Sequence, residues 1–251
     1  MSSATATKIY GLPLGPYSIG VTTTQFTDPK RADPGNPQKN RSLQTEIWYP
    51  AEPIADNVPR NKYSDFLGIN GLPNDKQAAA LAAANSDKAI GGYRDGLTIQ
   101  ELDDSVWINS AVRDAQPLQS ASSACPLVVF SHGSGAYRAS YIYWCEFLAS
   151  HGYVVAAPDH PGSARFTIVD GEVITPGGPR SERPSMEKER PLDVGTVIDG
   201  METLATTDSR FQGRVDCNNV AVTGMSFGGF TPAAYLECQD ARVKAAILQC
   251  P

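Results

Sequence analysis

Short, continuous apolar runs recur in the second half of this chain, and segments with helical periodicity separate them. The first two runs cover residues 126–131 and 153–158. Runs of this length without alternating polar residues indicate strands that are buried on both faces of a sheet. Between them, apolar residues within 137–150 keep helical spacing, and His151-Gly152 follows as a helix end would. Strand, helix and strand in this order predict a parallel crossover.

The same alternation continues to the end of the chain. Apolar residues recur at helical intervals over 192–204, and residues 220–222 form a third buried run. Residues 233–238 then predict a helix and residues 243–248 a fourth strand. This order predicts an α/β fold with a mostly parallel sheet.

The first half of the chain does not show this regular alternation of strand and helix patterns. Residues 17–24 and 43–49 are strand-like and predict an antiparallel hairpin, but the cluster 28–40 between them is rich in Pro, Gly, Asn and Asp. We expect this cluster to interrupt the ladder. An alanine-rich stretch after Asn74, with Gln77 at capping-box spacing, predicts one or two short helices within a long connection.

A second long connection follows the strand predicted at 153–158. Residues 161–190 hold four prolines and a Gly-Gly pair, so they predict a loop that serves either as a lid or as a plain insertion.

Composition narrows the classes of function. The 251 residues are 41% hydrophobic, which is enough for one sizeable core, and the net charge of -6 disfavours nucleic acid as a partner. No run approaches the roughly 20 apolar residues of a membrane span, and the N-terminus carries no visible export signal. Five cysteines, an odd number, predict mainly reduced thiols. We therefore expect a cytoplasmic protein, or a secreted one if a leader was removed.

The strongest chemical signal is Gly224-Met225-Ser226-Phe227-Gly228, which lies between an apolar strand and a helix. This is the context of a nucleophile elbow, a strained strand-to-helix turn that exposes a serine hydroxyl. Small neighbours are needed because strand and helix approach closely there. The helix N-terminus also presents amide groups to developing negative charge. The pattern predicts Ser226 as a nucleophile. The alternative is an ordinary glycine-rich turn, which can have the same sequence.

A second element precedes it in the chain. The loop after the first buried strand reads Ser131-His132-Gly133-Ser134-Gly135. Small residues there let a backbone amide point across the end of the sheet toward an acyl oxygen. We expect the amides of Ser134 and Phe227 to form an oxyanion hole. The alternative is a strand-end turn in which His132 makes a structural hydrogen bond.

These segments resemble the α/β-hydrolases related to dienelactone hydrolases and to platelet-activating factor acetylhydrolases. The resemblance rests on residues 130–138, 148–162, 190–194 and 224–229, and on the openings at 15–21 and 45–51. It implies an α/β-hydrolase fold and a Ser-His-Asp esterase without metal or organic cofactor. It matches Ser226 to the nucleophile and the amides of Ser134 and Phe227 to the oxyanion donors. The implied substrate is a small ester with a short acyl, lipid or lactone-like group.

The chain departs from this family after Ser226. The remaining segment, 227–251, contains only Glu237 and Asp240 as acids and no histidine, whereas the fold places its acid and then its histidine after the serine. We therefore expect residues 1–251 to form one domain that lacks its C-terminal strands. The alternative function is a catalytically incomplete chain that binds an acyl ligand or a complementing C-terminal segment.

The three histidines of the chain are poor candidates to replace the missing base. His132 and His151 are expected to be structural, and His160 is the sole stand-in base, because it follows a strand at the active-site edge. Asp159 cannot orient His160, since adjacent side chains diverge there. The spacing of the histidines and cysteines predicts no metal site. Four aromatic residues after the loop either line the cleft or pack the helix on the sheet: Tyr137, Tyr141, Tyr143 and Trp144.

Overall fold

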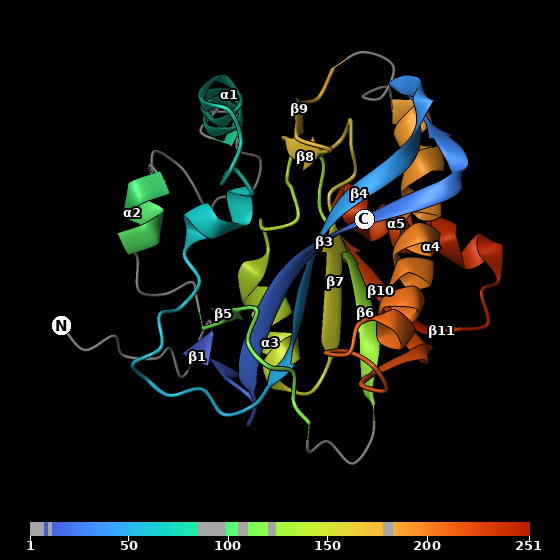
Figure 1. Cartoon of the computed structure of the whole chain (residues 1–251). Helices are drawn as coiled ribbons and strands as arrows, with labels where there is room; N and C mark the ends of the chain where they lie inside the picture. Colours follow the sequence, from blue (N-terminus) through green and yellow to red (C-terminus); the bar gives the residue numbers. More distant parts are fainter. Residues whose placement is uncertain (1–7, 10–11, 85–98, 105–109, 120–123, 178–182) are drawn as a thin grey trace.

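A computed structural model describes residues 8–9, 12–84, 99–104, 110–119, 124–177 and 183–251 (Figure 1). Its main sheet has seven strands in the order β11-β10-β6-β7-β4-β3-β5. These strands are β3 (Ser18–Asp33), β4 (Asn36–Ala51), β5 (Val112–Arg113), β6 (Cys125–Ser131), β7 (Val154–Pro158), β10 (Val215–Met225) and β11 (Val243–Gln249). The pairs of β11, β10, β6 and β7 are parallel, and β4 pairs antiparallel with both β7 and β3. The predicted α/β fold with a mostly parallel sheet and an N-terminal hairpin is confirmed.

Helices and two small hairpins surround this sheet. The helices are η1 (Tyr63–Leu67), α1 (Asn74–Ala84), α2 (Ile99–Asp104), α3 (Ile142–Ser150), α4 (Arg183–Thr207), α5 (Phe227–Tyr235) and η3 (Leu236–Cys238). Strand β1 (Lys8–Ile9) pairs with β2 (Leu12–Pro13), and β8 (Thr167–Val169) pairs with β9 (Glu172–Ile174). Helices α1, α2 and η1 lie together at one end of the molecule, away from α4 and α5 (Figure 1).

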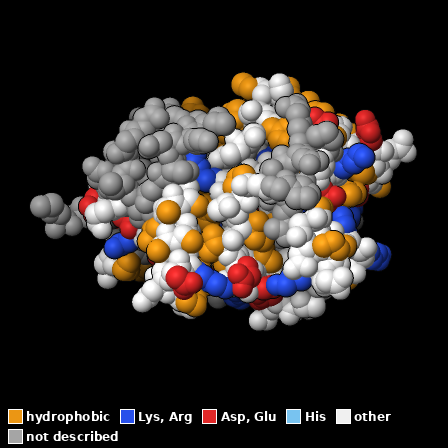
Figure 2. Space-filling model, turned by 90° about the horizontal axis from the view of Figure 1, so that it is seen from above, with side chains coloured by type: hydrophobic (Ala, Val, Ile, Leu, Met, Phe, Trp, Pro, Cys, Tyr) orange, Lys and Arg blue, Asp and Glu red, His pale blue; other side chains and the backbone are white. Residues whose placement is uncertain are grey.

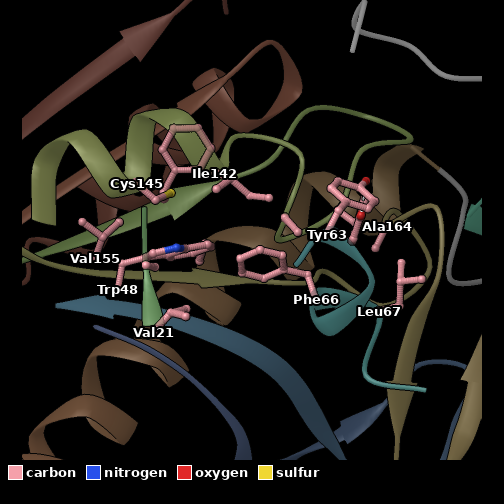
Figure 3. Packing of buried hydrophobic residues seen from close by; sticks show 14 of the residues in the cluster. Val21, Trp48, Tyr63, Phe66, Leu67, Ile142, Cys145, Val155 and Ala164 are labelled. Atoms are coloured by element: carbon pink, nitrogen blue, oxygen red, sulfur yellow. Dashed lines mark hydrogen bonds between the residues drawn. The ribbon is translucent and has the colours of Figure 1, made fainter. Parts of the chain in front are cut away.

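The side-chain alternation of the strands divides the core into two clusters. Val128 of β6 and Val155 of β7 face a cluster with α3, and their neighbours Val129 and Ala156 face a second cluster with α4. In the first cluster, Trp48 lies against Phe66, Cys145 and Val155 (Figure 3). Successive residues of a strand point to opposite faces, so a strand buried on both faces has the unbroken apolar sequence seen here.

The hairpin differs from the prediction for 28–40. The ladder runs on through this cluster, with Asp28 opposite Arg41 and Asp33 opposite Asn36, and irregular steps in register absorb the misfit. Buried ion pairs hold the polar extension: Arg41 binds Asp193 of α4 at 2.8 Å, and Arg31 binds the same carboxylate at 2.7 Å. The expected interruption was wrong because contacts with a distant helix outweigh local turn chemistry.

Three other boundaries also differ. Residues 161–190, predicted as a loop, contain the β8–β9 hairpin and the start of α4, which continues through Pro191 instead of beginning at residue 192. The helix expected over 137–150 begins at Ile142, and the helix expected over 233–238 begins already at Phe227. The part of the 161–190 prediction that falls on 178–182 lies outside the described residues. Among the described helices, none is long and apolar enough to cross a membrane.

Candidate active site

Ser226 occupies the turn between β10 and α5. Its backbone has φ 56° and ψ -123°, a conformation that non-glycine residues rarely adopt. The side chain is exposed, and the Ser226 amide donates to the carbonyl of Gln249 at the end of β11 (2.8 Å). The Ser226 carbonyl accepts the amides of Gly229 and Phe230, which start the helix. The predicted elbow geometry is therefore present.

Glycines permit this turn because backbone atoms occupy the space of a side chain. A Cβ atom on Gly224 would lie 2.2 Å from the carbonyl oxygen of Gly228, and one on Gly228 would lie 2.0 Å from that of Ser131. Strand β10, helix α5 and the end of β6 thus meet backbone to backbone. The sequence prediction of small neighbours around Ser226 is confirmed.

The loop after β6 lies beside the elbow. A Cβ atom on Gly133 would stand 3.5 Å from the Cβ of Ser226. A small cavity of about 230 Å³ opens next to this contact, and its lining includes both Ser134 and Phe227. The other lining residues are Gly135, Gly162, Ser163, Pro176 and Met186. The amide of Ser134 donates no hydrogen bond to any residue that the structure describes. The two predicted oxyanion donors thus border one cavity.

His132 lies beneath the loop as a neutral, buried side chain. The amide of His160 donates to its Nε2 (3.1 Å), so the ring proton is on Nδ1 and donates to the carbonyl of Gly133 (2.7 Å). Burial, followed by the positive charge of Arg190, holds the pKa of His132 well below its usual value. The structural hydrogen bond expected as the alternative role of His132 is present.

His160 has partners other than Ser226. Its Nδ1 lies 2.9 Å from Asp193 Oδ2, and its Nε2 lies 3.2 Å from the Ser131 hydroxyl. Burial and then the nearby Arg190 charge lower the pKa of His160 to about 4. A neutral ring therefore donates to Asp193 and accepts from Ser131. Asp193 was not predicted from the sequence. The one available signal was its position three residues after Arg190, which places both residues on one face of a helix.

Asp159 does not orient His160, as expected. It accepts the amide of Arg138 at 2.7 Å and pairs with the Arg138 guanidinium. Burial lowers the pKa of Arg138, but the charges of Asp159 and Glu46 raise it more, so the group is charged. The two adjacent side chains thus belong to separate networks.

The Ser226 hydroxyl has no hydrogen-bond partner among the described residues. The two acids that follow it are engaged or distant: Asp240 accepts from Tyr235 (2.7 Å) and pairs with Arg242, and Glu237 is exposed in η3. Within the described ranges, no three His, Cys, Asp or Glu side chains are grouped so that they could hold a metal ion. No hydrogen bond or ion pair among the described residues therefore supplies a base for Ser226.

The aromatic residues after the loop divide between the two predicted roles. Tyr137 is buried in the core, and Trp144 packs against the same cluster. The Tyr141 hydroxyl lies beside Gly133, where a Cβ would be 3.2 Å from it. Tyr141 therefore borders the site, whereas Tyr137 packs the fold.

Comparison with known proteins agrees with this geometry. Residues 13–174 match the family described as platelet-activating factor acetylhydrolase, isoform II, and residues 122–251 match the family described as serine aminopeptidase, S33. The platelet-activating factor acetylhydrolases of Cavia porcellus and Canis lupus familiaris are 25% and 29% identical over 93% of this chain.

A solved structure gives the same picture. The ferulic acid esterase from Streptomyces cinnamoneus matches 97% of this chain with a TM-score of 0.66 and 28% identity. The match covers 62% of that esterase and 53% of each of the two acetylhydrolases. This chain thus spans only about half the length of the curated relatives it matches.

Proposed function

This chain belongs to the platelet-activating factor acetylhydrolase family, and from that premise we propose that it hydrolyses small carboxylic esters through an acyl-enzyme on Ser226. The observation that carries the proposal is the exposed, strained Ser226 beside a cavity lined by Phe227 and Ser134. The fold resemblance to dienelactone hydrolases stays a prediction.

The proposed reaction has two steps. The Ser226 oxygen attacks the ester carbonyl carbon while a base takes its proton, and the carbonyl oxygen becomes an anion. When the carbonyl re-forms, the base returns the proton to the leaving oxygen and the alcohol departs. The amides of Phe227 and Ser134 donate to that anion, and the N-terminus of α5 adds a favourable dipole. Water then attacks the acyl-enzyme and releases the acid. We assign no metal or organic cofactor to these steps.

The cavity beside the elbow is the proposed acyl site. Its volume of about 230 Å³ suits a short acyl group, and its wall combines the apolar Pro176, Met186 and Phe227 with few polar atoms. No charged residue lines the described part of the cavity, which fits a small uncharged ester better than a polyanion. On the face shown in Figure 2, acidic and basic side chains lie mixed along the lower edge. The predicted absence of a nucleic-acid partner stays a prediction.

The base that activates Ser226 is proposed to come from a complementing C-terminal segment. Strand β11 is the last strand of the sheet order, and its Ile247 and Leu248 are 52% and 42% exposed. An exposed apolar edge strand is a template for a further strand. We propose that residues 1–251 and such a segment form one domain. Co-expression of the reading frame past Pro251 as a separate polypeptide, followed by copurification, tests this pairing.

The compartment is a further proposal. All five cysteines are free thiols, which fits the reducing cytoplasm. Cell fractionation followed by immunoblotting tests it, and recovery of the protein from the medium contradicts it.

Fluorophosphonate labelling followed by mass spectrometry tests the nucleophile. We expect a single adduct on Ser226 when this chain is co-expressed with the C-terminal segment that supplies the base. An adduct on another serine contradicts the proposal. A folded chain that binds an acyl ester but forms no adduct and releases no product supports the alternative, an incomplete chain that only binds.

A further inference from the structure

Arg190 is a buried cation that has no acidic partner among the residues that the structure describes. Its side chain in α4 is fully buried, and within the described part of the chain no carboxylate lies within ion-pair distance of it. Its Nε has no hydrogen-bond partner in the described ranges. Burial lowers the pKa of Arg190 to about 9, although the charge of Asp193 partly opposes this. Burying a charge without a partner is costly, and such a cost is found mainly at functional sites.

The guanidinium of Arg190 contacts both sides of the proposed oxyanion site, the loop after β6 and the Phe227 ring of α5, and also the cavity residue Ser163. It donates to the His132 carbonyl (2.6 Å) and the Ser163 hydroxyl (2.6 Å), and it reaches the Gly133 carbonyl (3.5 Å). Its central carbon lies 4.6 Å from the centre of the Phe227 ring. Arg190 therefore links the loop after β6 to the first residue of α5.

The contact with Gly133 helps to set the direction of the next amide. The Gly133 carbonyl and the Ser134 N–H belong to one peptide unit, and the described chain has no cis peptide bonds. In a trans peptide the carbonyl oxygen and the amide hydrogen point in opposite directions. Because the His132 ring (2.7 Å), the Ala136 amide (3.2 Å) and Arg190 (3.5 Å) together hold this carbonyl, the Ser134 N–H points away from them.

We propose that Arg190 is a positioning residue of the oxyanion hole, which anchors the 132–134 backbone and the Phe227 ring so that the amides of Ser134 and Phe227 both face the anion. Its positive charge behind these two donors adds to their field, since it acts in a dry interior. The inference rests on the proposed function, and it gives a role to Arg190 in the 190–194 segment, for which the sequence alone predicts none.

The kinetic test uses Arg190→Met, with Arg242→Met as the control. Arg242 also binds α4, through Asp199 and Glu202, and contacts no residue of the 132–134 loop in the part of the chain that the structure describes. The rate constant for fluorophosphonate labelling of Ser226, and kcat and KM for acetyl esters, are measured with the base present, in this chain co-expressed with the C-terminal segment or in the longer protein if the gene continues. We expect Arg190→Met to lower the labelling rate and kcat about 100-fold with KM nearly unchanged, since one lost oxyanion donor costs roughly that much. The control is expected to stay within a few-fold of wild type.

Two further readouts separate positioning from folding. Crystal structures of Arg190→Met and Arg190→Lys are expected to show the 133–134 peptide rotated in the first and retained in the second. Added guanidinium is expected to restore part of the labelling rate in Arg190→Gly and none in Ser226→Ala. An unrotated peptide together with a labelling rate within threefold of wild type overturns this inference. If Ser226→Ala is still labelled or active, the proposed function itself fails.

Discussion

Nδ1 of His160 lies 2.9 Å from Oδ2 of Asp193, and both side chains are fully buried below the loop that carries Ser134. The same carboxylate accepts from Arg41 at 2.8 Å. Burial raises the pKa of Asp193, but the Arg41 charge outweighs it and holds that pKa far below its usual range. A charged Asp193 thus keeps the His160 proton on Nδ1 and leaves Nε2 to accept from Ser131. The acid–histidine pair supports the loop and does not reach Ser226.

The first prediction concerns pH and His160. Its pKa is about 4 in the folded chain, below the usual value of 6.5, so between these pH values the unfolded chain binds a proton there and the folded chain does not. The free energy of unfolding therefore falls as the pH falls from 6.5 toward 4, by up to about 1.4 kcal/mol per pH unit from this group. His160→Gln keeps both hydrogen-bonding roles and is expected to lose this part of the slope. Urea unfolding at several pH values measures it.

The control for this experiment is His151→Gln, which replaces an exposed histidine at the end of α3. The idea is wrong if His160→Gln and wild type have parallel curves of unfolding free energy against pH.

The second prediction concerns Gly228. Alanine there would place its Cβ 2.0 Å from the Ser131 carbonyl oxygen, and backbone on both sides cannot move away cheaply. We expect Gly228→Ala to lower the free energy of unfolding by about 3 kcal/mol or more. Gly71→Ala is the control, since no atom lies within 4 Å of its added Cβ; its φ of 84° is expected to cost only about 1 kcal/mol. Equal losses in the two variants would contradict the packing argument.

The elbow was predictable from sequence because its determinants are local. A strand, a Gly-flanked serine and a helix are adjacent in the chain. The buried strands before and after this segment are recognisable as continuous runs of apolar residues. The support beneath the site was not predictable, because it joins residues far apart in the chain: Arg31 and Arg41 of the hairpin with Asp193 of α4. The start of α4 was not predictable either. Residues 183–191 are mostly polar and contain Pro191, so they show no helical periodicity of apolar residues.

The third prediction concerns Ser226 itself. Its hydroxyl is exposed and without a partner among the described residues, so Ser226→Ala is expected to change the free energy of unfolding by less than about 0.5 kcal/mol. Ester hydrolysis and fluorophosphonate labelling are expected to vanish. Turnover that persists in the purified variant above the level of a mock preparation would remove Ser226 from the mechanism.

The fourth prediction concerns the activity of residues 1–251 alone. No described side chain is bonded to the Ser226 hydroxyl to take its proton, and an esterase without its base retains only the roughly 10³ to 10⁴-fold acceleration that the oxyanion hole and binding supply. We expect poor or no ester turnover, together with self-association through the exposed apolar edge of β11. Light scattering and a p-nitrophenyl acetate assay measure both. A soluble monomer with an ordinary esterase kcat would show that the base lies within residues 1–251, and His160→Ala is then the next variant.

The last prediction concerns the length of the acyl group. Met186 is a buried residue in the wall of the cavity that Phe227 and Ser134 also line, so its truncation is expected to enlarge the space for an acyl chain. Met186→Ala is expected to raise kcat/KM for p-nitrophenyl hexanoate relative to the acetate about tenfold, because each methylene accommodated in an apolar pocket contributes about 1 kcal/mol or more. Met201→Ala is the matched control, since this second buried methionine of α4 lies in the core cluster and outside the cavity lining. The panel is run with and without EDTA, on the longer protein if the gene continues past Pro251. An unchanged acyl preference in Met186→Ala, or an equal shift in Met201→Ala, would place the acyl group elsewhere, and loss of activity with EDTA would contradict a metal-free reaction.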